Sequence, residues 1–247
     1  MLLGLYKILT FGQKNVQIVT DGLVLNLDAG DTSSYPGSGT TWYDISGNGL
    51  TGALTNGPTY DSANEGSIVF DGVNDYVDVT DTPLRITGVS FTMEVWFYYD
   101  GNSSKAYAIA GKRNSSPYNQ YSLWIGNGTA SVTPGNVLFG FVRIDESGGD
   151  RSTNYTLPSA GIYHAALIND SSSLKLYVNN VLRATTSNTY PSPANLLISG
   201  QNFRIGELYT GDRYLNGKVY TTRLYNRALS ASEVEQNFNA LRGRYGI

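Results

Sequence analysis

Residues 89–99 read Val-Ser-Phe-Thr-Met-Glu-Val-Trp-Phe-Tyr-Tyr, and apolar side chains occupy every second position from Val89 to Phe97. Successive side chains of a β-strand point to opposite faces of its sheet, so this period of two predicts a strand with one face buried. Similar patterns extend along the chain in both directions. They predict further strands at residues 23–29, 67–70, 76–79, 107–111, 121–125, 137–144, 161–168, 174–178, 203–206 and 218–225.

The segments between these strands are rich in Asn, Asp and Gly, such as Asp71-Gly72 and Asn179-Asn180. These residues accept the positive φ angles of tight turns, which join antiparallel neighbours. So many strands exceed what one open sheet usually holds. The sequence therefore predicts an all-β fold in which two antiparallel sheets pack as a sandwich. The stretch Thr185–Asn195 is predicted to be a loop, because Ser, Thr, Asn and Pro dominate it.

The C-terminal residues 230–242 have the pattern of a short helix. Ser230 and Glu233 have the spacing of a capping box, in which each side chain satisfies a backbone N–H of the first turn. Val234, Phe238 and Leu241 form one apolar stripe. We expect the helix to stop at Gly243 and to dock at the end of the sandwich.

Composition and charge exclude several classes of protein. The 247 residues include no Cys and one His, which excludes disulfide frameworks, thiolate metal sites and cysteine nucleophiles. The 17 basic and 20 acidic residues give a net charge of −3, so neither nucleic acid nor an anionic membrane is an expected partner. With 40% hydrophobic and 15% charged residues, the chain is expected to fold as one globular domain over residues 21–247.

The first twenty residues differ from the rest of the chain. Residues 1–12 are mostly apolar, but Lys7 interrupts them and no basic segment or cleavage site flanks them, so we expect no signal peptide. The stretch is also too short to span a membrane. We predict an N-terminal arm over residues 1–20 that either anchors the protein to other structural subunits or covers a flank of its own domain. Copies of the chain itself are further candidate partners.

Short blocks along the chain carry a resemblance to a known family. They are Gly22–Ala29, Trp42–Gly49, Ser67–Val77, Phe91–Phe97, Tyr163–Ala166 with Leu174–Asn179, Phe203–Gly206 and Gly217–Ser230. In this order they resemble the LamG-like jelly-roll domains of the concanavalin A-like lectin/glucanase superfamily. The resemblance implies a jelly-roll sandwich, but it does not fix the function, because one fold hosts unrelated activities. Chains with an apolar arm before one such jelly roll also resemble structural proteins of phage particles.

Enzymes of this superfamily hydrolyse β-glucans with carboxylates at alternate positions of a strand, in a pattern like ExDxxE. The sequence has no such pattern, because Glu94 stands alone in its strand. Asp75 and Asp78 are three positions apart and face opposite sides of their strand, so they cannot share a proton. His164 lies in an apolar strand, and the chain has no GxSxG nucleophile motif. We predict a structural His164 and no enzymatic activity.

A structural calcium ion is a candidate cofactor, because the resemblance implies one at the sandwich edge and calcium takes oxygen ligands. The oxygen-rich candidates are Asp28, Asp44, Asn48, Asp71, Asn74 and Asp75. Family members often read GKIDEVRIY near the last strand. Tyr220 and Thr221 replace the two acidic residues of that pattern here, which argues against the ion.

Aromatic side chains supply the candidates for glycan binding. The chain has 19 Tyr, and an amphipathic ring near a strand end can meet a sugar or a protein partner equally well. The sequence does not separate these two roles. The candidate glycan contacts are Tyr98, Tyr118, Tyr121, Trp124, Tyr209 and Tyr214.

Together these observations predict a non-enzymatic structural and adhesive protein of a virion, as a phage capsid decoration, tail or fibre component. Its jelly roll would face outward for contact with a cell-surface glycan, at the virion or extracellular surface. The alternative is a free carbohydrate-binding lectin-like module, and a glycoside hydrolase is the less favoured third. The apolar arm favours the first prediction, because a free lectin gains nothing from an exposed apolar segment.

Overall fold

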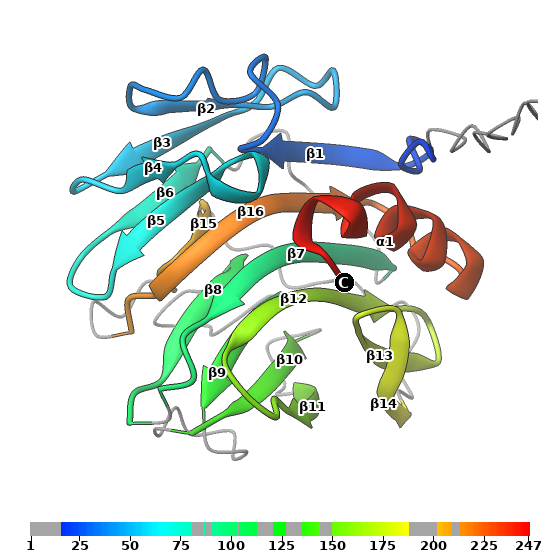
Figure 1. Cartoon of the computed structure of the whole chain (residues 1–247). Coiled ribbons are helices and arrows are strands. Elements are labelled where there is room, and N and C mark those ends of the chain that lie inside the picture. Colours follow the sequence, from blue (N-terminus) through cyan, green and yellow to red (C-terminus); the bar gives the residue numbers. More distant parts are fainter. Residues whose placement is uncertain are drawn as a thin grey trace, which may run out of the picture.

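Alternating apolar side chains build two antiparallel β-sheets that stack face to face around one core (Figure 1). The computed structural model describes residues 16–80, 86, 90–102, 104–112, 121–126, 135–143, 150–187, 202–208 and 213–247. Within these residues each sheet has eight strands. The arrangement confirms the predicted two-sheet antiparallel sandwich.

We call the two layers sheet 1 and sheet 2. Sheet 1 runs β14 (Val181–Ser187), β13 (Ser173–Val178), β12 (Gly161–Asn169), β7 (Phe91–Tyr99), β16 (Asn216–Tyr225), β5 (Ser67–Asp71) and β4 (Thr59–Asp61), and β1 (Leu23–Asp28) also pairs with β16. Sheet 2 runs β11 (Asp150–Thr156), β10 (Val137–Arg143), β9 (Tyr121–Gly126), β8 (Tyr107–Lys112), β15 (Phe203–Ile205), β6 (Tyr76–Val79), β3 (Thr51–Thr55) and β2 (Thr41–Tyr43). A short 3₁₀ turn, η1 (Ala63–Glu65), precedes β5, and the helix α1 (Ala231–Tyr245) ends the chain.

The core lies between the inner faces of the sheets. Phe91, Met93 and Val95 of β7 are fully buried, and so are Leu123 and Ile125 of β9 in the opposite sheet. Burying each such side chain stabilises the fold by about 1.5–3 kcal/mol. The period of two that predicts these strands is therefore the pattern that fills the core.

The alternating sequence pattern does not predict five of the observed strands, which are β2, β3, β4, β11 and β14. Four of them, β2, β4, β11 and β14, are the outermost strands of their sheets. An edge strand has a single neighbour, and polar residues there also discourage pairing with other chains, so alternation is weak. In consequence β11 reads Asp-Arg-Ser-Thr-Asn-Tyr-Thr, and β14 takes residues 185–187 from the predicted loop.

The predicted capping box of α1 is confirmed. Ser230 Oγ accepts from Glu233 N at 3.3 Å, and Ser230 N donates to Glu233 Oε2 at 2.8 Å. The predicted stop at Gly243 is wrong, because the helix continues to Tyr245 and ends where Gly246 adopts a left-handed conformation. Burial of Tyr245 in the last turn offsets the low helix propensity of a single glycine.

The helix lies on the outer face of sheet 1 rather than at the end of the sandwich (Figure 1). Phe238 stacks on Trp96 of β7 with ring centroids 5.4 Å apart, and the Tyr245 ring lies 4.4 Å from the same indole. Val234 packs with Ala166 of β12. Outward-facing aromatic residues of sheet 1 therefore need a cover, which α1 supplies.

Polar groups are buried beneath this helix. Asn237 is fully buried; its Nδ2 donates to Glu94 Oε2 at 2.7 Å and to the Tyr225 hydroxyl at 3.0 Å. Its Oδ1 accepts from Val19 N at 2.7 Å, and the Tyr225 hydroxyl donates to Val19 O. The last residues of the predicted arm, 16–20, thus contact their own domain, and residues 1–15 lie outside the described residues.

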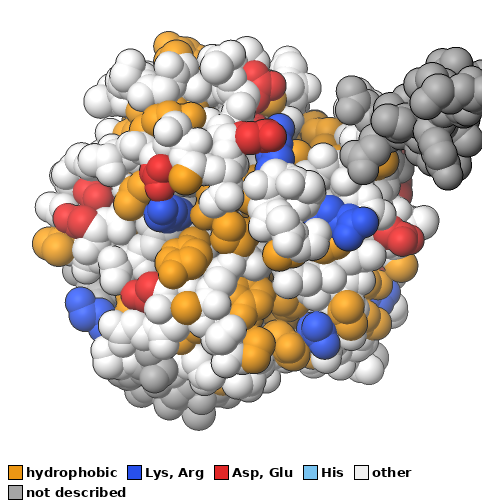
Figure 2. Space-filling model, viewed as in Figure 1, with side chains coloured by type: hydrophobic (Ala, Val, Ile, Leu, Met, Phe, Trp, Pro, Cys, Tyr) orange, Lys and Arg blue, Asp and Glu red, His pale blue; other side chains and the backbone are white. Residues whose placement is uncertain are grey.

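Part of the outer face of sheet 1, next to α1, carries apolar side chains. Figure 2 shows hydrophobic side chains gathered over the centre of the face that carries the helix. Tyr98 and Ile162 are partly buried there against the aromatic cluster of Trp96 and Phe238. Among the described residues, no helix has the length and apolar character needed to cross a bilayer.

Candidate functional site

A cluster of polar and aromatic side chains stands on the outer face of sheet 2. Tyr76 and Asp78 alternate along β6, and Arg204 of β15 lies directly opposite Asp78 in the strand register. The Arg204 guanidinium lies over the Tyr76 ring, 4.6 Å from its centroid, and its Nε is 3.5 Å from Asp78 Oδ2. Glu207, just after β15, accepts a hydrogen bond from Arg204 Nη1. We call Tyr76, Asp78, Arg204 and Glu207 the Arg204 cluster.

The charge of Arg204 is fixed by its neighbours. Burial lowers its pKa, but the hydrogen bond and charge of Glu207, with Asp78, outweigh burial and hold the pKa above its ordinary value. The Asp78 and Arg204 side chains remain 22% and 26% exposed, so solvent and solutes reach them. A binding site requires such exposure, whereas an ion pair buried in the core has none.

The cluster has unused hydrogen-bonding capacity. Asp78 Oδ1 has almost no contact with solvent and no hydrogen-bond partner in the protein. A buried acceptor without a partner is costly, and such groups in native proteins usually meet a water or a ligand. A carboxylate and a guanidinium beside an aromatic face can bind hydroxyl groups and an apolar ring surface at once.

A second aromatic group continues this face toward β9 and β10. Trp124 packs on Phe139 with ring centroids 5.4 Å apart, and Leu208 joins them one residue after Glu207. Trp124 is only 4% exposed, so it cannot offer an open platform as the sequence predicts. Its Nε1 is buried without a hydrogen-bond partner.

The other predicted glycan contacts do not form one platform. Tyr121 is 2% exposed and points into the core between Phe91 and Phe203, which corrects its prediction as a ligand contact. Tyr98 lies on sheet 1, and the half-buried Tyr214 precedes β16. Tyr118 and Tyr209 lie outside the described residues.

The predicted calcium ligands lie in three separate places. Asp28, at the end of β1, does not fit a calcium ion, because both of its oxygens accept from Arg244 Nη1 at 2.8 and 2.9 Å. Asp44 Oδ1 accepts from Asn26 N and Ser46 N, which fixes the turn before β3. Asn48 donates to two backbone carbonyls of β1.

The remaining calcium candidates share the turn between β5 and β6. Asp75 Oδ2 accepts from Asp71 N at 3.1 Å, and Asp71 Oδ1 accepts from Val73 N at 2.8 Å. Burial raises the pKa of Asp75, and the charge of Asp71 adds to the effect. Asn74 contributes its backbone oxygen to a bond from Asn56. The described residues contain no group of three His, Cys, Asp or Glu side chains placed to hold a metal. A calcium ion at this turn therefore gains no support from side-chain placement and stays a prediction.

The side chains considered for catalysis lie beneath α1. Glu94 is 1% exposed and bonded to Asn237, and His164 is fully buried with its Nε2 3.7 Å from Glu94 Oε1. The His164 ring lies 5.0 Å from that of Trp96. These groups stabilise the contact between helix and sheet, and a substrate has no path to them while α1 is in place.

Residues 71–235, about two thirds of the chain, match the family Laminin_G_3, described as the concanavalin A-like lectin/glucanases superfamily. The chain belongs to this superfamily. Its Laminin_G_3 match includes every residue of the Arg204 cluster, so the cluster is part of the lectin-like domain itself. No curated protein matches the sequence.

Solved structures with this fold include the binding domains of botulinum neurotoxins. One comes from type C, whose cell entry is described as dependent on two ganglioside molecules, with 15% identity and a TM-score of 0.69. Two others are the binding domain of neurotoxin DC in complex with SialylT (15% identity, TM-score 0.68) and with rat synaptotagmin II (14% identity, TM-score 0.69). Each alignment covers 90% of this chain but only 52% of the matched toxin chain, so this chain spans about half the length of those chains.

These comparisons confirm the predicted superfamily and lectin-like fold. None of the three structures is a phage protein, and likeness at this level of identity shows the fold alone. The sequence reasoning missed Tyr76, Asp78 and Arg204 as a site. Polar residues at alternate positions of β6 were a usable signal, but their approach to Arg204 depends on strand pairing far along the chain.

Proposed function

We propose that this lectin-like domain is a non-enzymatic binding module that holds a saccharide at the Arg204 cluster. The observation that carries the proposal is a partly exposed carboxylate and guanidinium, Asp78 and Arg204, beside the Tyr76 ring on one sheet face, with Asp78 Oδ1 lacking a partner in the protein. Saccharides present donor hydroxyls together with apolar ring faces. The cluster offers the complementary groups on short, rigid strands.

A binding role without catalysis is supported by the position of the acidic residues. A retaining glycosidase needs two carboxyl groups about 5–5.5 Å apart on either side of the scissile bond. In β7 the single acidic residue, Glu94, is covered by α1. In the Arg204 cluster, both carboxylates are paired with the same guanidinium. The related solved structures are also described as binding domains.

A glycan array with the full chain, followed by calorimetric titration of the best saccharide, tests this proposal. We expect Asp78→Asn and Tyr76→Ala each to weaken binding by at least about tenfold, because each removes one of the complementary groups. The matched control is Tyr43→Ala, which removes a 48% exposed tyrosine from the edge strand of the same sheet. Unchanged affinity in both cluster variants, or the absence of any bound glycan, contradicts the proposal. Release of shorter sugars from the bound saccharide contradicts the non-enzymatic role.

The location of the module is a further proposal. We propose that the protein is an adhesive component of a virion, anchored to other structural subunits through residues 1–20, with a cell-surface glycan as its ligand. The resemblance to phage structural proteins and the apolar arm support this role. Because Val19 is buried against α1, an informative truncation begins at Val16 and leaves residues 16–20 in place.

Light scattering on the full chain and on the chain beginning at Val16 tests the anchoring role. We expect the full chain to assemble and the truncated chain to stay monomeric at the same concentration, because the apolar residues 1–12 need a cover. Two soluble monomers of equal stability contradict the anchoring role but leave the saccharide site unaffected. That result favours the alternative function, a free lectin-like module, over a component of a virion.

A further inference from the structure

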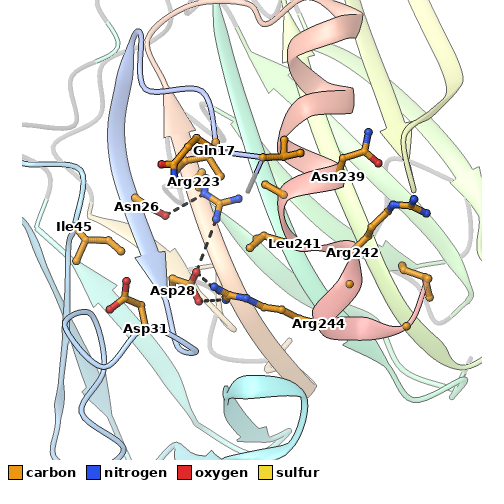
Figure 3. Close-up of a pocket in the computed structure, with 16 residues that line it drawn as sticks. Gln17, Asn26, Asp28, Asp31, Ile45, Arg223, Asn239, Leu241, Arg242 and Arg244 are labelled. Atoms are coloured by element: carbon orange, nitrogen blue, oxygen red, sulfur yellow. Dashed lines mark hydrogen bonds and ion pairs between the residues drawn. The ribbon is translucent and has the colours of Figure 1, made fainter. Parts of the chain in front are cut away.

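A polar pocket of about 990 Å³ lies between α1, β1 and β16 on sheet 1 (Figure 3). Gln17 and Ile18 border it on one side, and Asn239 and Arg242 of α1 border it on the other. Its volume is in the range of pockets that hold small ligands. The Arg204 cluster is on sheet 2, so the two sites are separate.

Arg223 of β16 contributes a buried guanidinium to this pocket. It is 1% exposed, and the register of β16 with β1 places it opposite Asn26. Its Nε donates to Asn26 Oδ1 at 3.1 Å, and its Nη2 lies 3.9 Å from Asp28 Oδ2 (Figure 3). Its Nη1 is buried without any hydrogen-bond partner in the protein. A guanidinium nitrogen in this state needs an acceptor.

The nearest carboxylate does not satisfy Arg223, because another arginine binds it more closely. Arg244 Nη1 donates to Asp28 Oδ1 at 2.8 Å and to Asp28 Oδ2 at 2.9 Å, while Arg244 Nε lies 2.8 Å from Glu65 Oε2. Figure 3 shows Arg244 reaching Asp28 from the last turn of α1, with Arg223 above the same carboxylate. Asp28 is thus shared by two arginines and is fully bonded to only one.

Charged side chains of both signs surround the pocket. Its lining includes the three arginines Arg223, Arg242 and Arg244 and the two carboxylates Asp28 and Asp31, and Glu65 also pairs with Arg244. Asp31 accepts from Ser33 N and Ser33 Oγ and so stabilises its own turn. The C-terminal end of α1 adds partial negative charge, which Arg242 and Arg244 offset. The group that lacks a partner is therefore Arg223 Nη1.

We infer that this pocket binds the carboxylate of an acidic sugar, with Arg223 Nη1 as the donor to that carboxylate. A carboxylate oxygen is the acceptor that the buried nitrogen lacks, and a charged acceptor forms a stronger hydrogen bond with a guanidinium than a neutral one does. The exposed side chain of Gln17 at the border is an amide that can bond a hydroxyl of the sugar ring. The pocket is therefore a second site, distinct from the saccharide site on sheet 2.

Titration of the full chain with glucuronate, glucose and sulfate, followed by NMR or calorimetry, tests the inference. Glucuronate and glucose differ in the carboxylate alone, so we expect glucuronate to bind at least about tenfold more tightly. Arg223→Met removes the donor and is expected to abolish this preference. Gln17→Glu places a carboxylate at the exposed border of the pocket, where it repels an anionic ligand, and so does not depend on removal of the buried arginine. Arg183→Gln, which removes an exposed charge on β14, is the matched control and should bind glucuronate normally.

Loss of glucuronate binding in Gln17→Glu, with binding retained in Arg183→Gln and in Tyr76→Ala, supports the inference and separates this pocket from the Arg204 cluster. Equal affinity for glucose and glucuronate overturns it, and so does glucuronate binding that Gln17→Glu leaves unchanged. Sulfate binding as tight as glucuronate binding overturns the assignment to an acidic sugar, because the site would then be a general anion site. If Arg223→Met fails to fold, Gln17→Glu decides the result alone.

Discussion

The outer faces of the two sheets are built from the same alternating strand pattern, but a helix covers one of them and the other is partly exposed. On sheet 1, helix α1 covers the outward residues, and Asn237 donates to the buried Glu94 carboxylate. On sheet 2, Asp78 and Arg204 remain partly exposed and Asp78 Oδ1 has no partner in the protein. Polar groups on the covered face therefore join the helix to the sheet, whereas those on the open face remain partly exposed.

The largest expected effect is on the covered face. Asn237→Ala removes the partner of the buried Glu94 carboxylate and of Val19 N, so we expect the free energy of unfolding to fall by about 3 kcal/mol. Urea unfolding measures this value. Asn239→Ala, an exposed position two residues along the same helix, is the control and should change it by less than about 0.5 kcal/mol. Equal losses in the two variants would show that the buried network does not stabilise the helix contact.

The ion pair between Arg227 and Glu233 at the start of α1 provides a pH test of the covered face. The hydrogen bond from Arg227, which outweighs the effect of burial, lowers the pKa of Glu233 to about 2 from its ordinary 4.5. A carboxyl group with a lowered pKa contributes stability that is present above pH 4.5 and is lost as the pH falls toward 2. We expect Glu233→Gln to remove this part of the pH dependence in thermal melts between pH 5 and about 2. Glu235→Gln, on the exposed side of the same helix, should leave it as in the unmodified protein.

Substitutions on the open face are expected to affect binding far more than stability. Asp78→Asn keeps the shape of the side chain and loses a solvent-accessible ion pair, so the free energy of unfolding should fall by less than about 1 kcal/mol. Urea unfolding beside the titration of the saccharide separates the two effects. A loss as large as that of Asn237→Ala would mean that Asp78 is a structural residue and that the two faces do not differ.

The smallest expected effect concerns calcium at the turn between β5 and β6. If Asp71 and Asp75 hold the ion, calcium should raise the melting temperature by a few degrees over a chelator, by linkage of binding to folding. Asp71→Asn should abolish that increase, and Asp44→Asn, in a turn fixed by backbone bonds, should retain it. Identical melting temperatures with calcium and chelator would make the calcium prediction wrong.

Local patterns in the sequence were enough for much of the fold. The alternation around Phe91–Phe97 and the similar runs elsewhere predict the central strands, and Ser230 with Glu233 predicts the start of α1. These signals are reliable because burial on one face and capping of a first turn depend on residues near one another in the chain. The motif blocks also placed the chain in the right superfamily.

Other features depend on contacts between distant residues, which no local pattern contains. The edge strands β11 and β14 form because a neighbouring strand supplies their hydrogen bonds, not because their own side chains are apolar. Tyr121 and Trp124 look alike as candidate aromatic contacts, yet one fills the core and the other packs against Phe139. Arg204 reaches Asp78, and Arg223 and Arg244 meet at Asp28, only because strand register and the docking of α1 bring them together. The sequence by itself determined which strands fill the core and how the helix begins; the tertiary structure alone decided which polar groups find a partner within the protein, because those partners come from distant parts of the chain.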